Sequence, residues 1–172
     1  MPESPEKMEL KPDLLEKINQ ALKELGSTLK YKRAPEFKKE YESLAGKTIV
    51  MVDDIVDVIE AIMPDLMVAT DGHADFVKYD QQDINQLIEQ IIAKNPDIVL
   101  LDYHLSNQLK GSAIAGSLKG QGFEGDIVGF SSDSGAKKDF EKAGITACVE
   151  KEAYNPSATI SSVGKIFSEE KE

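Results

Sequence analysis

The stretches KTIVMVDD (residues 47–54) and DIVLLDYHL (residues 97–105) decide the fold, because each is an apolar run that ends in acidic or polar residues. Continuous apolar runs of this length are typical of parallel strands that are covered on both faces. Two similar runs follow, DIVGFSSDS (126–134) and TACVEKE (146–152). Helical patterns lie between these runs, and regular alternation of this kind predicts an α/β fold with an open parallel sheet and helices on both faces.

Three helices are indicated between and after the strands by apolar residues at helical spacing. They occupy DINQLIEQIIAKN (83–95), AKKDFEKAG (136–144) and NPSATISSVGKIFSEE (155–170). In the first of them, the apolar side is expected to comprise Ile84, Leu87, Ile88, Ile91 and Ile92. In the last, Asn155 is the expected cap and Pro156 the expected first residue of the helix.

The stretch LMVATDG (66–72) has two interpretations, a second strand or the end of a long helix. Apolar residues keep helical spacing from Ile55 to Ala69, which favours the helix and makes ADFVKYD (74–80) the second strand. Pro64 argues against this interpretation, because proline kinks or breaks a helix interior. If the helix stops there, a long irregular insertion follows.

Residues 1–46 are predicted to form an N-terminal helical extension, and residues 47–172 the main domain. Pro12 and Asp13 suit a first helical turn, and Gly26 suits the end of that helix. A second short helix is expected from Pro35 onwards, with Phe37, Tyr41 and Leu44 on one face. We expect both apolar stripes to pack on the chain's own domain rather than on a partner.

The charge balance limits the classes of partner. The chain of 172 residues has 20 Lys and Arg against 31 Asp and Glu, a net charge of −11. Binding to nucleic acid needs clustered cations, so this balance argues against it, and also against an anionic membrane surface. The one cysteine, Cys148, excludes an internal disulfide. The start of the chain does not resemble a signal peptide and no apolar run is long enough to span a membrane, so a cytoplasmic location is expected.

Charged and hydroxyl side chains stand where the predicted strands end: Asp53, Asp54, Asp102, Ser131 and Lys151. A five-stranded sheet of this kind usually has the order 2-1-3-4-5, and ligands bind at the carboxyl ends of its strands. Three carboxylates packed together need a cation, and Mg²⁺ prefers carboxylate and phosphate oxygens. With a spare carboxylate, a hydroxyl and a lysine, such a site is equipped for phosphoryl transfer to an aspartate.

The segments KTIVMVDD, PDIVLLDYHLS, IVGFSS and VEKE, in this order and spacing, resemble the CheY-like receiver domain of two-component response regulators. The resemblance implies a flavodoxin-like fold for the part from Lys47 onwards. It implies that Asp53 and Asp54 hold Mg²⁺ and that Asp102 is phosphorylated. It also implies that His104 offers its backbone carbonyl to the metal, that Ser131 is the switch hydroxyl and that Lys151 is the lysine of the family.

The resemblance further implies a histidine kinase or phosphotransfer protein as phosphodonor and signalling through a downstream protein target. Enzymatic activity beyond self-phosphorylation and self-dephosphorylation is not expected, and a homodimer is left open. The sequence departs from the family pattern at Glu152, where proline is usual, and at Cys148, where an aromatic residue is usual. The loop after Asp102 also differs, and Gly111 matches a family glycine displaced by one residue.

Two alternative functions remain open from the sequence. A receiver-like docking module that is not phosphorylated is consistent with the departures at Cys148 and Glu152. An aspartyl-nucleophile phosphatase is less favoured, because His104 stands where such enzymes carry a second aspartate. The pattern GQGFEG (120–125) resembles a dinucleotide fingerprint, but it precedes a predicted strand instead of following one, so we interpret it as a loop.

Overall fold

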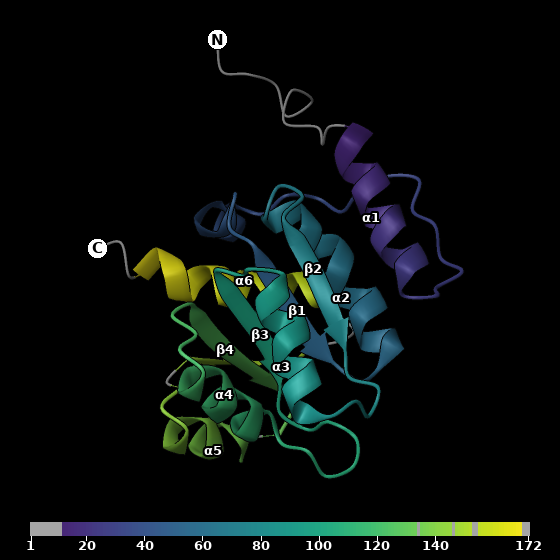
Figure 1. The fold of residues 1–172 in the computed structure, drawn as a ribbon. Coiled ribbons are helices and arrows are strands. Elements are labelled where there is room, and N and C mark those ends of the chain that lie inside the picture. Colours follow the sequence, from purple (N-terminus) through teal and green to yellow (C-terminus); the bar gives the residue numbers. More distant parts are fainter. Residues whose placement is uncertain (1–11, 134, 146, 153–154, 170–172) are drawn as a thin grey trace.

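Five parallel strands form one sheet in the order β2-β1-β3-β4-β5, as predicted (Figure 1). The structure, a computed structural model, describes residues 12–133, 135–145, 147–152 and 155–169. The strands are β1 (Ile49–Asp53), β2 (Ala74–Lys78), β3 (Ile98–Asp102), β4 (Asp126–Ser131) and β5 (Cys148–Glu150). This is the predicted flavodoxin-like arrangement, and it places β1 and β3 side by side at the centre of the sheet.

Helices cover both faces of the sheet (Figure 1). One face carries α2 (Val56–Ala69) and α6 (Pro156–Glu169), and the other carries α3 (Ile84–Ala93), α4 (Gly111–Gly120) and α5 (Ala136–Lys142). Because successive side chains of a strand point to opposite faces, β1 contributes to two separate buried clusters. Ile49 and Met51 join the cluster under α2 and α6, and Val50 and Val52 join the cluster under α3, α4 and α5.

Helix α2 runs through Pro64, which confirms the helical interpretation of LMVATDG. The proline leaves the helix without one backbone hydrogen bond, which costs about 3 kcal/mol. Ile59, Ile62 and Leu66 on the same helix are fully buried. Each such side chain contributes about 1.5–3 kcal/mol when it leaves water, so burial of the helix face outweighs the broken bond.

The described part of the N-terminal extension packs on the chain's own domain, as expected, and residues 1–11 of the predicted extension lie outside the described residues. Helix α1 (Pro12–Glu24) lies against α2, with Leu14, Ile18 and Leu22 in the same buried cluster as that helix. The second element, η2 (Lys39–Leu44), lies against α6, and Ser43 donates a hydrogen bond to the Gly164 carbonyl at 2.6 Å. The boundary between extension and domain at residue 46 stays a prediction.

Two local predictions were wrong. The second helix of the extension begins at Lys39 rather than near Pro35, and it is a 3₁₀ helix, because Lys38 still has an extended backbone (φ −106°, ψ 149°). In α3, Ile92 is 38 % exposed, since the buried stripe is narrower than predicted and contains only Leu87, Ile88 and Ile91.

In the described ranges, no helix is long and apolar enough to cross a membrane.

Candidate functional site

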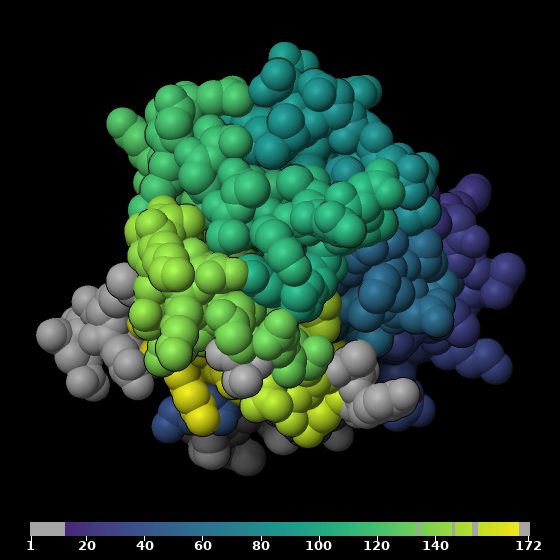
Figure 2. Space-filling view, turned by 90° about the horizontal axis from the view of Figure 1, so that it is seen from below, coloured from purple at the N-terminus to yellow at the C-terminus, as the bar shows by residue number. Residues whose placement is uncertain are grey.

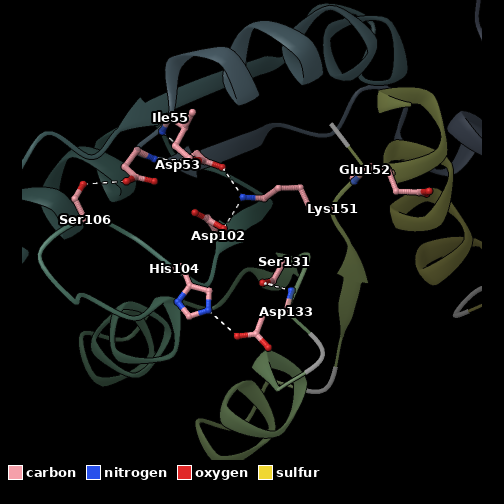
Figure 3. A network of polar contacts seen from close by, with 11 residues as sticks. Asp53, Ile55, Asp102, His104, Ser106, Ser131, Asp133, Lys151 and Glu152 are labelled. Carbon is pink, nitrogen blue, oxygen red and sulfur yellow. Dashed lines mark hydrogen bonds and ion pairs between the residues drawn. The ribbon is translucent and has the colours of Figure 1, made fainter. Parts of the chain in front are cut away.

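The carboxyl end of the sheet gathers residues that are far apart in the sequence. Seen from below, segments from the blue, green and yellow-green parts of the chain meet on one face (Figure 2). A closer view shows Asp53, Asp102, Ser131 and Lys151 beside one another at this end (Figure 3). Parallel strands deliver their last residues to the same place, so the topology alone accounts for this meeting.

Three carboxylates form the centre of the site. One oxygen each of Asp53, Asp54 and Asp102 can be chosen so that all three lie within 4.8 Å of one another. Asp53 is fully buried and Asp102 is 2 % exposed. Asp53 Oδ1 also accepts the backbone N–H groups of Asp54 (2.7 Å) and Ile55 (3.0 Å), where α2 begins. Asp53 therefore supports the start of a helix and keeps its second oxygen for the site.

Lys151 supplies a positive charge to this group. Its Nζ donates to Asp102 Oδ1 at 2.7 Å and to Asp53 Oδ2 at 3.1 Å, and it lies 4.7 Å from the centre of the Phe130 ring. The backbone N–H of Lys151 donates to the Ser131 carbonyl at 3.1 Å, which extends the pairing of β4 and β5 by one residue. The two carboxylates raise the pKa of Lys151, although burial alone would lower it. The ammonium therefore stays charged.

A single lysine leaves the three carboxylates with excess negative charge. Burial, followed by the neighbouring Asp53 carboxylate, raises the pKa of Asp102 to about 7 against the opposing effect of Lys151. Among the residues that the structure describes, two buried side-chain oxygens have no hydrogen-bond partner: Asp54 Oδ1 and Asp102 Oδ2. We call these the open oxygens. Carboxylate oxygens without partners, beside a third carboxylate, fit a hard divalent cation such as Mg²⁺.

Ser131 lies where the sequence predicted it, at the last position of β4 and 7 % exposed. Its hydroxyl accepts the backbone N–H of Asp133 at 3.0 Å, and Asp133 Oδ1 accepts the N–H of Gly135 at 2.8 Å. These two bonds shape the loop that leads into α5. The role of the hydroxyl as a switch stays a prediction.

His104 turns its side chain away from the carboxylates and toward the loop after β4 (Figure 3). Its Nε2 lies 2.6 Å from Asp133 Oδ2, and its Nδ1 lies 3.1 Å from Lys110 Nζ. The hydrogen bond from His104 is the main reason that the pKa of Asp133 is lowered. The side chain thus connects two loops at the border of the site, and metal binding by the backbone carbonyl of His104 stays a prediction.

The sequence interpretation missed one residue and undervalued another. Ser106 donates a hydrogen bond from its hydroxyl to Asp54 Oδ2 at 2.9 Å. Gly111 approaches β3 so closely that a Cβ atom there would lie 2.1 Å from the Asp102 carbonyl oxygen. Glycine at position 111 is therefore a steric requirement of the site, whereas no pattern in the sequence singled out Ser106.

Comparison with known proteins supports the fold. No protein-family model matches the chain, and no curated protein matches it by sequence. Among solved structures, the beryllofluoride-activated receiver domain of DrrB is 20% identical, with 72% of this chain and 97% of that chain covered and a TM-score of 0.53.

Two further similar structures have the same fold. The receiver domain of the histidine kinase CKI1 from Arabidopsis thaliana, complexed with Mg²⁺ and BeF3⁻, is 15% identical over 73% of this chain and 95% of that chain (TM-score 0.54). A two-component response regulator of the LuxR family from Aurantimonas sp. SI85-9A1 is 18% identical over 73% of this chain and 87% of that chain (TM-score 0.55). At these identities the likeness establishes the receiver fold.

Proposed function

We propose that this chain is a phosphoacceptor receiver domain of a two-component phosphorelay, which accepts a phosphoryl group on Asp102 with the help of Mg²⁺. One observation carries the proposal: three carboxylates and Lys151 meet at the carboxyl end of the sheet, and two buried oxygens there are left for a cation. The receiver fold supports the same interpretation, as does the CKI1 receiver domain that was solved with Mg²⁺ and BeF3⁻.

Each residue of the site has a role in this proposal. Asp53, Asp54 and Asp102 would hold the metal, with the backbone carbonyl of His104 as a further ligand. The cation would neutralise the carboxylates and the oxygens of the incoming phosphoryl group. Lys151 orients Asp102 through the 2.7 Å contact to Oδ1, which leaves Oδ2 available.

In the proposed transfer, a phosphohistidine of the partner protein is the phosphoryl donor. An oxygen of the Asp102 carboxylate attacks phosphorus, a new O–P bond forms, and the P–N bond breaks. The electron pair of the broken bond leaves with the imidazole nitrogen. Ser131, at the last position of β4, is proposed to donate a hydrogen bond to the transferred group.

The partners follow from this chemistry. The phosphodonor would be a histidine kinase or a phosphotransfer protein, and the output a protein target contacted through surfaces that phosphorylation alters. The net charge of −11 disfavours nucleic acid as a partner. A cytoplasmic location and the absence of turnover beyond self-dephosphorylation belong to the proposal, which is compatible with a homodimer.

A docking module that is never phosphorylated is the second candidate, and β5 is the observation that favours it. Cys148, at the position where the family usually has an aromatic residue, is only half-buried and packs against the cluster under α3, α4 and α5. Glu152 follows Lys151, and its backbone N–H donates to the buried Thr159 hydroxyl at 2.9 Å. A proline at position 152 has no N–H and could not make this bond, so the connection from β5 to α6 differs from the family pattern.

An intact-mass measurement after incubation with acetyl phosphate and Mg²⁺ tests the proposal. The wild type is expected to gain one phosphoryl mass, and Asp102→Asn none. Asp65→Asn is the matched control, because Asp65 is also a buried aspartate but lies away from the site. Beryllofluoride with Mg²⁺ should in addition shift NMR signals around Asp102. This reagent distinguishes a short-lived adduct from no reaction, and a wild type that shows neither response contradicts the proposal.

A further inference from the structure

The loop between β3 and α4 folds back on itself as a small hairpin, which we call the 104–110 hairpin. His104 and Lys110 form an antiparallel bridge at its base. Above them, the Leu105 N–H donates to the Leu109 carbonyl at 3.0 Å, and the Leu109 N–H donates to the Ser106 carbonyl at 3.3 Å. Leu105 and Leu109 thus lie opposite each other across a three-residue loop, and residues 106–109 form a β-turn with Ser106 at its first corner.

The turn has an unfavourable backbone. Asn107 and Gln108, its two central residues, have φ angles of 59° and 60°. Both angles are in the left-handed region, which a type I′ turn requires and which asparagine tolerates better than glutamine. The left-handed conformation is unfavourable for a residue such as glutamine, because its Cβ atom crowds the following carbonyl oxygen. The surrounding contacts must hold the hairpin in place.

The base of the hairpin is anchored on two sides. Leu105 is 5 % exposed and belongs to the buried cluster under α3, α4 and α5. The Gly111 N–H donates to the Tyr103 carbonyl at 2.6 Å. On the other side, the 2.6 Å contact between His104 and Asp133 ties the hairpin to the loop after β4 (Figure 3). These anchors fix the position of Ser106 relative to β3.

The hairpin thereby delivers the Ser106 hydroxyl to Asp54, 52 residues earlier in the chain, at 2.9 Å from Oδ2. The other oxygen of the same carboxylate, Oδ1, is one of the two open oxygens. We propose that Ser106 is a positioning residue, which holds Asp54 so that Oδ1 faces the site of the divalent cation. This inference rests on the proposed function, because it assumes that the carboxylates bind Mg²⁺.

The physical reason is the freedom of the Asp54 side chain. Asp54 is only partly buried, and the Ser106 hydroxyl holds one of its oxygens in a fixed place. A hydroxyl that donates to one carboxylate oxygen limits rotation and leaves the second oxygen for the metal. Groups that orient metal ligands in this way typically change metal affinity by about 10–100-fold when they are removed. A purely structural hydroxyl would instead affect stability and leave metal affinity unchanged.

Calorimetric titration of the full, metal-free chain with Mg²⁺ alone tests the inference. Ser106→Ala is expected to weaken Mg²⁺ binding about tenfold. Ser106→Thr keeps the hydroxyl and should bind Mg²⁺ close to the wild-type affinity. Ser162→Ala is the matched control, because Ser162 is also a half-buried serine with a single hydrogen bond, to the Ala158 carbonyl at 3.0 Å, but lies in α6.

The outcomes separate this inference from the proposed function. If the wild type binds Mg²⁺ and Ser106→Ala binds it equally well, the positioning role is wrong and the proposed function stands. If Ser106→Thr is as weak as Ser106→Ala, the hydroxyl is not responsible and the inference is again wrong. If the wild type itself does not bind Mg²⁺, both the proposed function and this inference are wrong.

Discussion

Within the part of the chain that the structure describes, two regions bury carboxylates, and they differ in what surrounds the charge. At the carboxyl end of the sheet, Asp53 and Asp102 share Lys151, and Asp102 Oδ2 is an open oxygen. Under the N-terminal extension, Asp65 is 8 % exposed and accepts a hydrogen bond from the Tyr41 hydroxyl at 3.1 Å. Burial raises the pKa of the acid in both regions, so a raised pKa does not by itself identify a functional site.

The comparison shows that crowding of charges distinguishes the site. Asp65 accepts a hydrogen bond from the neutral Tyr41 hydroxyl, and the one charged group that acts on its pKa is the cation of Lys38, which lowers it. Asp102 has a second buried carboxylate beside it, and the pair lacks charge compensation that a cation would supply. We therefore expect changes under the extension to alter stability alone, and changes at the carboxyl end of the sheet to alter ligand binding as well.

The largest effect on stability is expected from Leu44→Ala. Leu44 is fully buried between the extension and the domain, and truncating a buried leucine costs about 2–5 kcal/mol. Urea denaturation should show this loss in the free energy of unfolding, while the folded variant still responds to beryllofluoride with Mg²⁺. A loss below about 1 kcal/mol would mean that the extension packs only loosely, contrary to the cavity cost of a buried leucine.

A pair of glycine substitutions sharpens the contrast. In Gly164→Ala the new Cβ would lie 1.9 Å from the Glu40 carbonyl oxygen, and in Gly111→Ala it would lie 2.1 Å from the Asp102 carbonyl oxygen. Overpacking of this kind costs about 1–3 kcal/mol, so both variants should lose stability. Only Gly111→Ala should also lose Mg²⁺ binding in a calorimetric titration. Equal Mg²⁺ affinities in the two variants would contradict the separation of the regions.

The smallest expected effect is a change in how the stability of the metal-free protein depends on pH. The pKa of Asp102 is raised to about 7 in the folded chain, above its value in the unfolded chain, so the folded state binds more protons over the interval between them. Metal-free stability should therefore fall as the pH rises toward and through 7. Asp102→Asn should reduce this fall and raise the free energy of unfolding by about 1–2 kcal/mol at pH 8.

Thermal or urea unfolding of the metal-free proteins across this pH range checks the expectation, with Asp65→Asn as the matched control. Asp65 has a neutral hydrogen-bond partner rather than a carboxylate neighbour. Asp65→Asn should therefore raise the free energy of unfolding at pH 8 by less than Asp102→Asn does. Mg²⁺ should stabilise the wild type, because a ligand that binds only the folded state raises its stability. A wild type whose stability rises between pH 5 and 8 more steeply than that of Asp102→Asn would refute the assigned direction.

Much of the fold and of the site could be predicted because the information is local. The apolar runs located the strands. The helical spacing correctly predicted that α2 continues past Pro64. The type of the second element of the extension could not be predicted, since a 3₁₀ turn and an α-helix share the same apolar pattern over six residues. The contact of Ser106 with Asp54 could not be predicted either, because it depends on a hairpin whose turn, Asn-Gln, is not a strong sequence signal.

The sequence by itself determined which residues end the strands, and with them the acidic, hydroxyl and ammonium groups at the carboxyl end of the sheet. A strand end is visible where a continuous apolar run gives way to charged or polar residues, and this change is written directly in the chain. Only the tertiary structure decided which oxygens are engaged: Asp53 at the start of α2, Asp54 with Ser106, and Asp65 with Tyr41. Those pairings join segments up to 52 residues apart, and their geometry depends on how the helices and loops pack.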